Sequence, residues 1–175
     1  MSPTSIPGVR VRKAIPNDAD AILSLVDGLA AYEKLTPPDA AAKKRLIHDI
    51  FAERPRMEAY LGEYGGRAVG YAFVFETYSS FLALPTLYLE DLFVLPEFRG
   101  NSVGFGLFRA MVEEAHSRGC GRMEWAVLDW NQLAIDFYQR FGAKHLKEWQ
   151  VYRLAREDMQ EILKRWPAGE SSRPS

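Results

Sequence analysis

A glycine-rich loop between an apolar strand and an amphipathic helix has the composition of an anion-binding site. It runs from Arg99 to Gly106, with the sequence RGNSVGFG. The first turn of a helix leaves backbone N–H groups without acceptors, and glycine lets phosphate oxygens approach those groups closely. Arg99 adds forked donors that suit phosphate. The same glycines are equally compatible with a tight turn that needs them only for its backbone conformation.

Two further pairs of residues could take part in acid–base chemistry. Glu90 and Asp91 are adjacent carboxylates inside an apolar strand. Neighbouring strand residues point to opposite faces, so we expect at least one of the two to be partly buried. Asn131 and Tyr138 lie seven residues apart in a helical segment, about two turns, and project from nearly the same face. Each pair also has a structural interpretation: a salt-bridged acid, or a helix N-cap with a core aromatic residue.

Composition excludes several classes of protein. The 175 residues are 47% hydrophobic, enough for one sizeable core, and the net charge of −1 gives no general attraction to nucleic acid or anionic lipid. The single Cys120 excludes an internal disulfide, and the three histidines lack metal-ligand spacing, so we predict no metal. The amino terminus lacks the apolar core of a signal peptide, and no segment approaches a membrane span. We therefore expect a cytoplasmic protein without a membrane partner.

The pattern of apolar residues predicts an α/β protein. Strands are expected at 9–14, 57–64, 67–76, 86–95, 122–128 and 148–154. Helices are expected at 16–34, with Asp18 as the capping residue, and at 39–53, 102–117, 131–141 and 156–166. Helices and hairpin strands come first and are followed by alternating strands and helices, which implies a mixed sheet with helices packed on it. One domain over 9–166 is predicted, with flexible ends at 1–8 and 167–175.

Three pieces of sequence, in this order, resemble the GNAT superfamily of acyl-coenzyme A dependent N-acetyltransferases. The first two are the strand LEDLFV at 89–94 and the loop PEFRGNSVG at 96–104. The third is a spaced pattern of WN at 130–131, A at 134, DFY at 136–138 and GA at 142–143. The segments LAAYEKL, LYLEDLFV and DWNQLAIDFY are similar to the diamine (spermidine/spermine) N-acetyltransferase branch. The resemblance implies a single α/β domain with a mixed, mostly antiparallel sheet of about six to seven strands. That sheet would be splayed between its fourth and fifth strands, with helices on both faces.

The resemblance also implies acetyl-CoA as the cofactor and indicates where it binds. The pyrophosphate of coenzyme A would lie on the backbone amides beside Arg99, which belong to Gly100, Asn101, Ser102, Val103, Gly104, Phe105 and Gly106. The strand edge at Leu92, Phe93 and Val94 would hydrogen-bond the pantetheine arm. Asn131 and Ala134 would contact the cofactor from the later helix.

Catalytic and substrate-binding roles follow from the same resemblance. Tyr138 would face the sulfur as general acid, Glu90 would deprotonate the amine directly or through water, and Tyr32 and Glu33 match substrate-binding positions. An alkylammonium with a pKa near 10 cannot attack a thioester until it loses a proton, so a carboxylate within reach is useful. A tyrosine with a pKa of about 10 gives its proton only reluctantly to a thiolate with a pKa of about 8.5. Tyr138 would therefore act mainly as a hydrogen-bond donor to developing charge.

The sequence departs from the family pattern at two positions. Ser102 occupies the place of a family glycine, and serine tolerates a positive φ poorly. Gln150 occupies the place of an acid that grips the far end of a polyamine, so a distal ammonium would lose a charge-assisted partner. Gln150 is kept as a substrate-binding candidate. Short diamines and lysine-like amino acids therefore stand beside spermidine as candidate substrates.

We thus predict an enzyme that transfers an acetyl group from acetyl-CoA to a primary amine of a small molecule, by direct attack in a ternary complex. One alternative is an acetyltransferase acting on a protein amino terminus or an aminoglycoside. Another is a non-catalytic acyl-CoA-binding sensor. Relatives in this branch are usually homodimers, which makes a homodimer the expected state, and nothing in the sequence favours a nucleic-acid partner.

Overall fold

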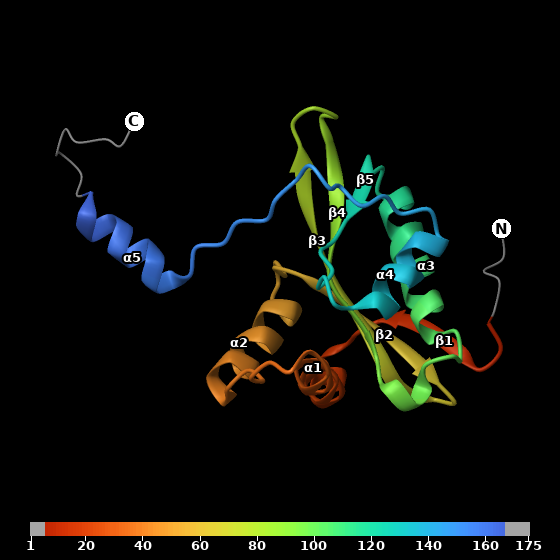
Figure 1. Cartoon of the computed structure of the whole chain (residues 1–175). Helices are drawn as coiled ribbons and strands as arrows, with labels where there is room; N and C mark the ends of the chain where they lie inside the picture. The colour runs from red at the N-terminus through yellow and green to blue at the C-terminus, as the bar shows by residue number, and fades with distance from the viewer. Residues whose placement is uncertain (1–5, 167–175) are drawn as a thin grey trace. The chain divides into compact units, whose positions relative to one another are not determined.

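The computed structural model describes residues 6–166, and the described chain divides into two units, 6–126 and 127–166. The first unit holds a five-stranded sheet in the order β1-β2-β3-β4-β5 (Figure 1). Its elements are β1 (Val9–Lys13), α1 (Ala19–Glu33), α2 (Ala40–Phe51), β2 (Glu58–Tyr64), β3 (Arg67–Ser79), β4 (Leu84–Val94), α3 (Val103–Ser117) and β5 (Arg122–Glu124). The second unit contains α4 (Gln132–Arg140) and α5 (Arg156–Arg165). The prediction of one domain over 9–166 stays a prediction. Of the flexible ends predicted at 1–8 and 167–175, only 6–8 lie within the described residues.

The predicted fold class is confirmed, with a correction to the number of strands. β1 to β4 pair in antiparallel fashion and β5 runs parallel to β4, so the sheet is mixed and mostly antiparallel. Within residues 6–166 there are five strands, where six to seven were expected. The stretch 149–155 forms no strand, and β5 ends at Glu124 instead of continuing to 128. An alternating pattern supplies strand propensity, but a strand also needs a neighbour to complete its ladder of hydrogen bonds.

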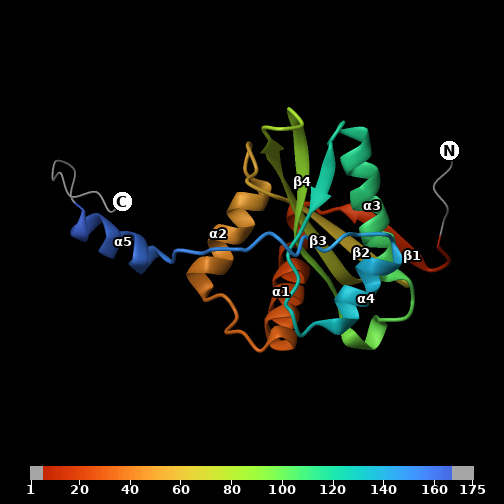
Figure 2. The same ribbon diagram turned by 45° about the horizontal axis from the view of Figure 1, so that its top comes forward.

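Helices cover both faces of the sheet in the first unit (Figure 2). On one face, Ile22 and Leu25 of α1 and Ile50 of α2 pack in a buried cluster with apolar residues of β2, β3 and β4. The strand members of that cluster are Ala59, Leu61, Tyr71, Phe73 and Phe93. α3 packs on the opposite face. No helix within residues 6–166 combines the length and apolar character needed to cross a membrane.

Two paired glycines let α3 lie close to the sheet. Gly62 of β2 and Gly70 of β3 are register partners. A Cβ atom on Gly62 would stand 2.7 Å from Cγ1 of Val103 and 3.0 Å from Cδ1 of Leu107, both in the first two turns of α3. Val103 and Leu107 are fully buried, so neither side chain has space to move aside. The absence of side chains at this pair therefore fixes the height of the α3 amino terminus above the sheet.

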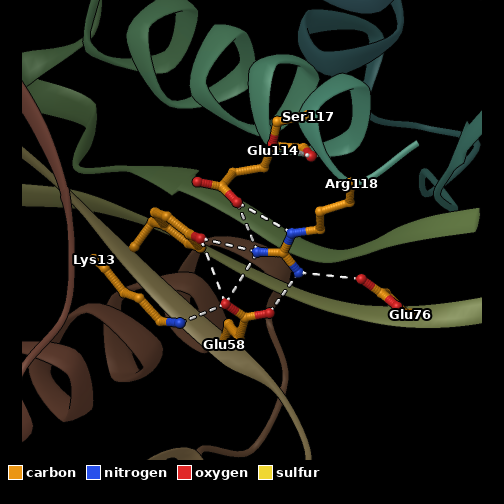
Figure 3. Close-up of polar contacts among 7 residues, drawn as sticks. Lys13, Glu58, Glu76, Glu114, Ser117 and Arg118 are labelled. Atoms are coloured by element: carbon orange, nitrogen blue, oxygen red, sulfur yellow. Dashed lines mark hydrogen bonds and ion pairs between the residues drawn. The ribbon is translucent and has the colours of Figure 1, made fainter. Parts of the chain in front are cut away.

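A partly buried ion cluster fastens the other end of α3. Arg118 follows α3 directly and donates hydrogen bonds at 2.6 Å and 3.1 Å to the two carboxylate oxygens of Glu58 on β2 (Figure 3). It also contacts Glu114, Glu76 and the hydroxyl of Tyr60. Burial raises the pKa of Glu58, but hydrogen bonds from Arg118 and Lys13 outweigh burial and hold this pKa below its usual value. The contact therefore stabilises the fold above the ordinary glutamate pKa and loses its effect as the pH falls below that value.

Asp18 has a different partner from the one expected. It precedes α1 as predicted, but its side chain makes no cap hydrogen bond to the helix. Its two carboxylate oxygens instead accept bonds of 2.7 Å and 2.8 Å from Arg12 of β1, and the backbone N–H of Ile15 also donates to it. The nearby guanidinium competes successfully because a charge-assisted bidentate bond is stronger than a bond to a backbone amide.

We predict that Gly62→Ala lowers the free energy of unfolding by about 1–3 kcal/mol, because the added methyl group overpacks the contact with Val103 and Leu107. Urea unfolding of both proteins measures the difference. Gly104→Ala is the matched control, since a Cβ atom there would meet only Cγ2 of Val94 at an ordinary 3.7 Å. Equal unfolding midpoints for wild type and Gly62→Ala would contradict this account of the packing.

Candidate active site

β4 has a bulge at two adjacent carboxylates. β3 and β4 are in register at Phe73 with Asp91 and at Val74 with Leu89, so Glu90 is an extra residue on β4. Two residues of a bulged strand oppose one residue of its partner, which removes the strict alternation of side chains between them. We expected Glu90 and Asp91 to point to opposite faces because side chains alternate in a regular strand. The bulge removes that reason. The charge of Glu90 adds to burial in raising the pKa of Asp91 and of Tyr71.

Asp91 is the partly buried acid that the sequence led us to expect. The hydroxyl of Tyr71, a fully buried residue of β3, donates a 3.0 Å hydrogen bond to Oδ2 of Asp91. Burial raises the pKa of Asp91 to about 6, the bond from Tyr71 lowers it in part, and the charges of Glu90 and Glu33 raise it further. Glu90, in contrast, is exposed. Asp91 therefore titrates close to neutral pH, where a carboxylate can both accept and release a proton.

The carboxyl end of α1 adds a third acid. Glu33 is the last residue of α1, where the helix dipole disfavours a negative charge. It is half-buried, and burial raises its pKa above the usual range. Its charge also raises the pKa of Asp91, so the two carboxylates act on the same region. The charges of the half-buried Glu33 and of the exposed Glu90 thus both act on the partly buried Asp91, an arrangement that a bound cation would stabilise.

Arg99 connects this acidic region with the glycine loop. Its guanidinium carbon lies 4.3 Å from the ring centroid of Tyr32 on α1 and 5.9 Å from that of Phe93 on β4. Its Nε donates a 3.1 Å hydrogen bond to the carbonyl of Val94. Arg99 was predicted to face a phosphate. The structure places its guanidinium on the ring of Tyr32, beside the predicted substrate residue Glu33.

The loop from Gly100 to Gly106 has a geometry that fits a diphosphate. Ser102 is the residue before α3, makes no side-chain cap and adopts a left-handed conformation with φ of 63°. Gly100 also has a positive φ, and a Cβ atom there would meet nothing within 4 Å. The first amides of a helix have no acceptor within the helix, so those of Ser102, Val103 and Gly104 are oriented toward the space before α3. This combination of donors, dipole and open backbone fits a phosphate group.

Other residues of the loop hold it in shape. Nδ2 of Asn101 donates to the carbonyl of Phe98, which closes the turn. The amide of Gly106 already donates to the carbonyl of Ser102, and a Cβ atom on Gly106 would stand 3.2 Å from Cγ1 of Val9. Gly106 therefore serves the packing of α3 against β1, and its N–H has its acceptor inside the helix. Phe105, between these positions, is partly exposed.

The carboxyl half of β4 has an open edge beside the loop. The parallel ladder with β5 covers only Thr86 to Tyr88, paired with Arg122 to Glu124. In the described chain, β5 is the only strand on that side of β4, so the edge from Leu89 to Val94 has no strand partner there. This matches the predicted separation of the fourth and fifth strands. Backbone groups along such an edge can hydrogen-bond an extended ligand, as expected for Leu92, Phe93 and Val94.

The remaining predicted residues belong to the second unit. Oδ1 of Asn131 accepts a 3.2 Å bond from the N–H of Ala134, which confirms Asn131 as the N-cap of α4. Tyr138 is half-buried in the last turns of α4, with its ring 5.2 Å from that of Phe137. Gln150 is exposed and its Oε1 accepts a 2.8 Å bond from the Tyr152 hydroxyl. The roles of these residues toward a cofactor or substrate stay predictions.

Comparison with known proteins identifies the family. Residues 27–143 match the Acetyltransferase (GNAT) family, and the chain belongs to it. The thialysine N-epsilon-acetyltransferase of Bos taurus is 34% identical over 165 residues, covering 88% of this chain and 96% of that protein. A human spermidine/spermine N(1)-acetyltransferase-like protein is 28% identical over 172 residues, covering 93% of this chain and 25% of that protein. These matches confirm the resemblance to the diamine branch and the prediction of an N-acetyltransferase.

A solved structure shows the same fold. An integron cassette protein from V. cholerae superposes with a TM-score of 0.75 at 20% identity, covering 90% of this chain and 98% of that one. Proteins of the GNAT family use acetyl-CoA as the acetyl donor, in agreement with the cofactor expected from the sequence.

The structure adds two residues to those indicated by the sequence. Asp91 had been noted as a neighbour of Glu90, and Tyr71 had been placed in a strand without a role. The pair of consecutive polar residues in LYLEDLFV interrupts the alternation of β4, and this interruption is the signal of a bulge. The partner Tyr71 could not be found in this way, since it comes from another strand.

We predict that Ser102→Gly raises the free energy of unfolding by up to about 1 kcal/mol, because glycine adopts a left-handed conformation without steric cost. Thermal and urea unfolding measure the change. Ser117→Gly, at the last residue of the same helix, is the matched control and should instead destabilise the protein. A lower free energy of unfolding in Ser102→Gly would contradict the prediction. It would mean that the serine side chain stabilises the protein by more than its left-handed backbone conformation costs.

Proposed function

We propose that this protein transfers an acetyl group from acetyl-CoA to a primary amine of a diamine or a lysine-like amino acid. The observation that carries the proposal is the partly buried Asp91 at the β4 bulge, on which the charges of Glu90 and Glu33 both act, on a stretch of β4 without a strand partner on one side in the described chain. An amine is a cation at neutral pH, and three carboxylates whose charges act on one position favour such a substrate. The similarity to an enzyme named for thialysine agrees with an amine at the end of an amino-acid side chain.

The chain offers suitable groups for each part of the cofactor. The amides of Ser102, Val103 and Gly104 would hold the diphosphate, and the edge of β4 would hold the pantetheine arm. Bound there, acetyl-CoA would supply a thioester carbonyl for the amine to attack. Arg99, stacked on Tyr32, supports both the loop and the end of α1, and it thereby connects cofactor binding with substrate binding.

The acids would have two tasks. They attract the ammonium ion electrostatically, and one of them takes a proton from it so that the nitrogen gains a free electron pair. The resemblance indicates Glu90 for the second task, directly or through water, and Asp91 is a second carboxylate on the same stretch of β4. Tyr138 would donate a hydrogen bond to the charge that develops on the leaving group. The homodimer and the cytoplasmic location stay predictions.

We expect Tyr138→Phe to lower kcat by roughly ten- to a thousandfold with little change in the Kd of acetyl-CoA, because only the phenol hydroxyl is lost. Steady-state kinetics and isothermal titration give the two numbers. Tyr78→Phe, which removes the hydroxyl of an exposed tyrosine of β3 outside the proposed site, is the control. An unchanged kcat in Tyr138→Phe would return Tyr138 to the role of a core aromatic residue.

A thiol-release assay over a panel of amines tests the proposed function. Putrescine, spermidine, thialysine and lysine cover short diamines, a longer polyamine and amino acids with a terminal amine. We expect acetyl-CoA cleavage that depends on at least one short diamine or lysine-like amino acid. Thermal stabilisation by acetyl-CoA without turnover of any amine would indicate a sensor. Turnover only of an aminoglycoside or of a peptide amino terminus would overturn the substrate class.

A further inference from the structure

The two carboxylates at the β4 bulge differ in exposure and in hydrogen bonding. Glu90 is exposed. Asp91 is partly buried, and Oδ2 is held by the phenol of Tyr71 at 3.0 Å. A proton acceptor benefits from a fixed position, which the bond from Tyr71 supplies at Asp91, and from a pKa near the working pH, which burial supplies. The exposed Glu90 is better suited to attract a cation from solution.

Resting on the proposed function, we propose that Asp91 accepts the proton of the substrate ammonium and that Tyr71 is the positioning residue that holds it. In this step one N–H bond of the ammonium breaks and the proton moves to the Asp91 carboxylate, which becomes a carboxylic acid. The electron pair stays on the nitrogen, which is then a neutral amine able to attack a carbonyl carbon. Glu90 and Glu33 contribute their negative charge and keep the cation in place.

The anchoring of Tyr71 makes this arrangement rigid. Tyr71 is fully buried in the core, with its ring 4.6 Å from that of Phe73 and 6.2 Å from that of Phe93. Its phenol donates to Oδ2, and in the described part of the chain Oδ1 of Asp91 has no comparable partner. A carboxylate has two acceptor oxygens, so Oδ1 is the atom that would take the substrate proton. Tyr71 thus fixes the direction in which this oxygen points.

Burial is the largest cause of the raised pKa of Asp91, and groups from three elements modify this pKa. Tyr71 of β3 donates a hydrogen bond and favours the charged form, while Glu90 of β4 and Glu33 of α1 disfavour it. Because the bond from Tyr71 stabilises the carboxylate, removing the hydroxyl must raise the pKa of Asp91. A base that protonates at higher pH loses activity on the acidic side of the profile. At alkaline pH the carboxylate is charged in both proteins.

Tyr71→Phe tests the proposal through the pH profile of kcat/KM. We expect the acidic limb to move upward by about one pH unit, with kcat/KM reduced about fivefold at pH 6, about tenfold at pH 5 and below, and nearly unchanged above pH 8. Tyr60→Phe is the matched control. It also removes a hydroxyl from a buried tyrosine of the sheet, but that hydroxyl is bonded to Arg118 and Glu58, so the limb should stay in place. A merely structural role for Tyr71 would lower activity equally at all pH values.

Two further variants separate the carboxylates. Asp91→Asn should abolish the acidic limb and lower kcat by more than about a hundredfold, while the Kd of acetyl-CoA stays the same. Glu90→Gln should mainly raise the KM of the amine and keep the limb. The reverse pattern, or an unmoved limb in Tyr71→Phe, would overturn the proposal while the wild type still turns over amines. A wild type without amine-dependent thiol release would instead overturn the proposed function.

Discussion

The register between β3 and β4 shifts by one residue at Glu90, and the positions of the charged groups follow from that shift. In a regular strand, Glu90 and Asp91 would lie on opposite faces of the sheet and would not share a ligand. With Glu90 as the extra residue, the hydroxyl of Tyr71 donates to Asp91, and the charge of Glu90 raises the pKa of Asp91. The bulge lies within the stretch of β4 from Leu89 to Val94, which the short ladder with β5 leaves without a strand partner on that side in the described chain. The two carboxylates and a backbone edge that could hydrogen-bond an extended ligand therefore occur on one strand.

The second requirement is the position of α3. Gly62 and Gly70 let Val103 and Leu107 lie directly on the sheet, and the cluster around Arg118 fastens the far end of the helix. The first amides of α3 are then held near Val94 at the end of β4, whose carbonyl accepts a hydrogen bond from Nε of Arg99. Because Arg99 stacks on Tyr32, the loop and the end of α1 support each other. The diphosphate and the amine, on this account, bind to parts of one rigid framework.

Local features of this protein could be read from the sequence, and features that depend on distant partners could not. α3 and α4 begin within one residue of the expected positions, since apolar spacing and the Asn131 cap are local signals. The stretch 148–154 alternates like a strand, yet it forms none, because a ladder also requires a neighbouring strand. The residues of the loop were identified, but the stacking of Arg99 on Tyr32 joins segments far apart in the chain. The bond between Tyr71 and Asp91 depends on the register of two strands, and no sequence pattern specifies its partner.

The central claim is that the β4 bulge and the start of α3 bind the two substrates side by side. A crystal structure with coenzyme A and a diamine or lysine-like amine bound together tests it most directly. We expect diphosphate oxygens within hydrogen-bonding distance of the amides of Ser102, Val103 and Gly104. We also expect the amine nitrogen within reach of Asp91 and Glu90. A diphosphate bound away from α3, or an amine bound where neither carboxylate can reach it, would contradict the account.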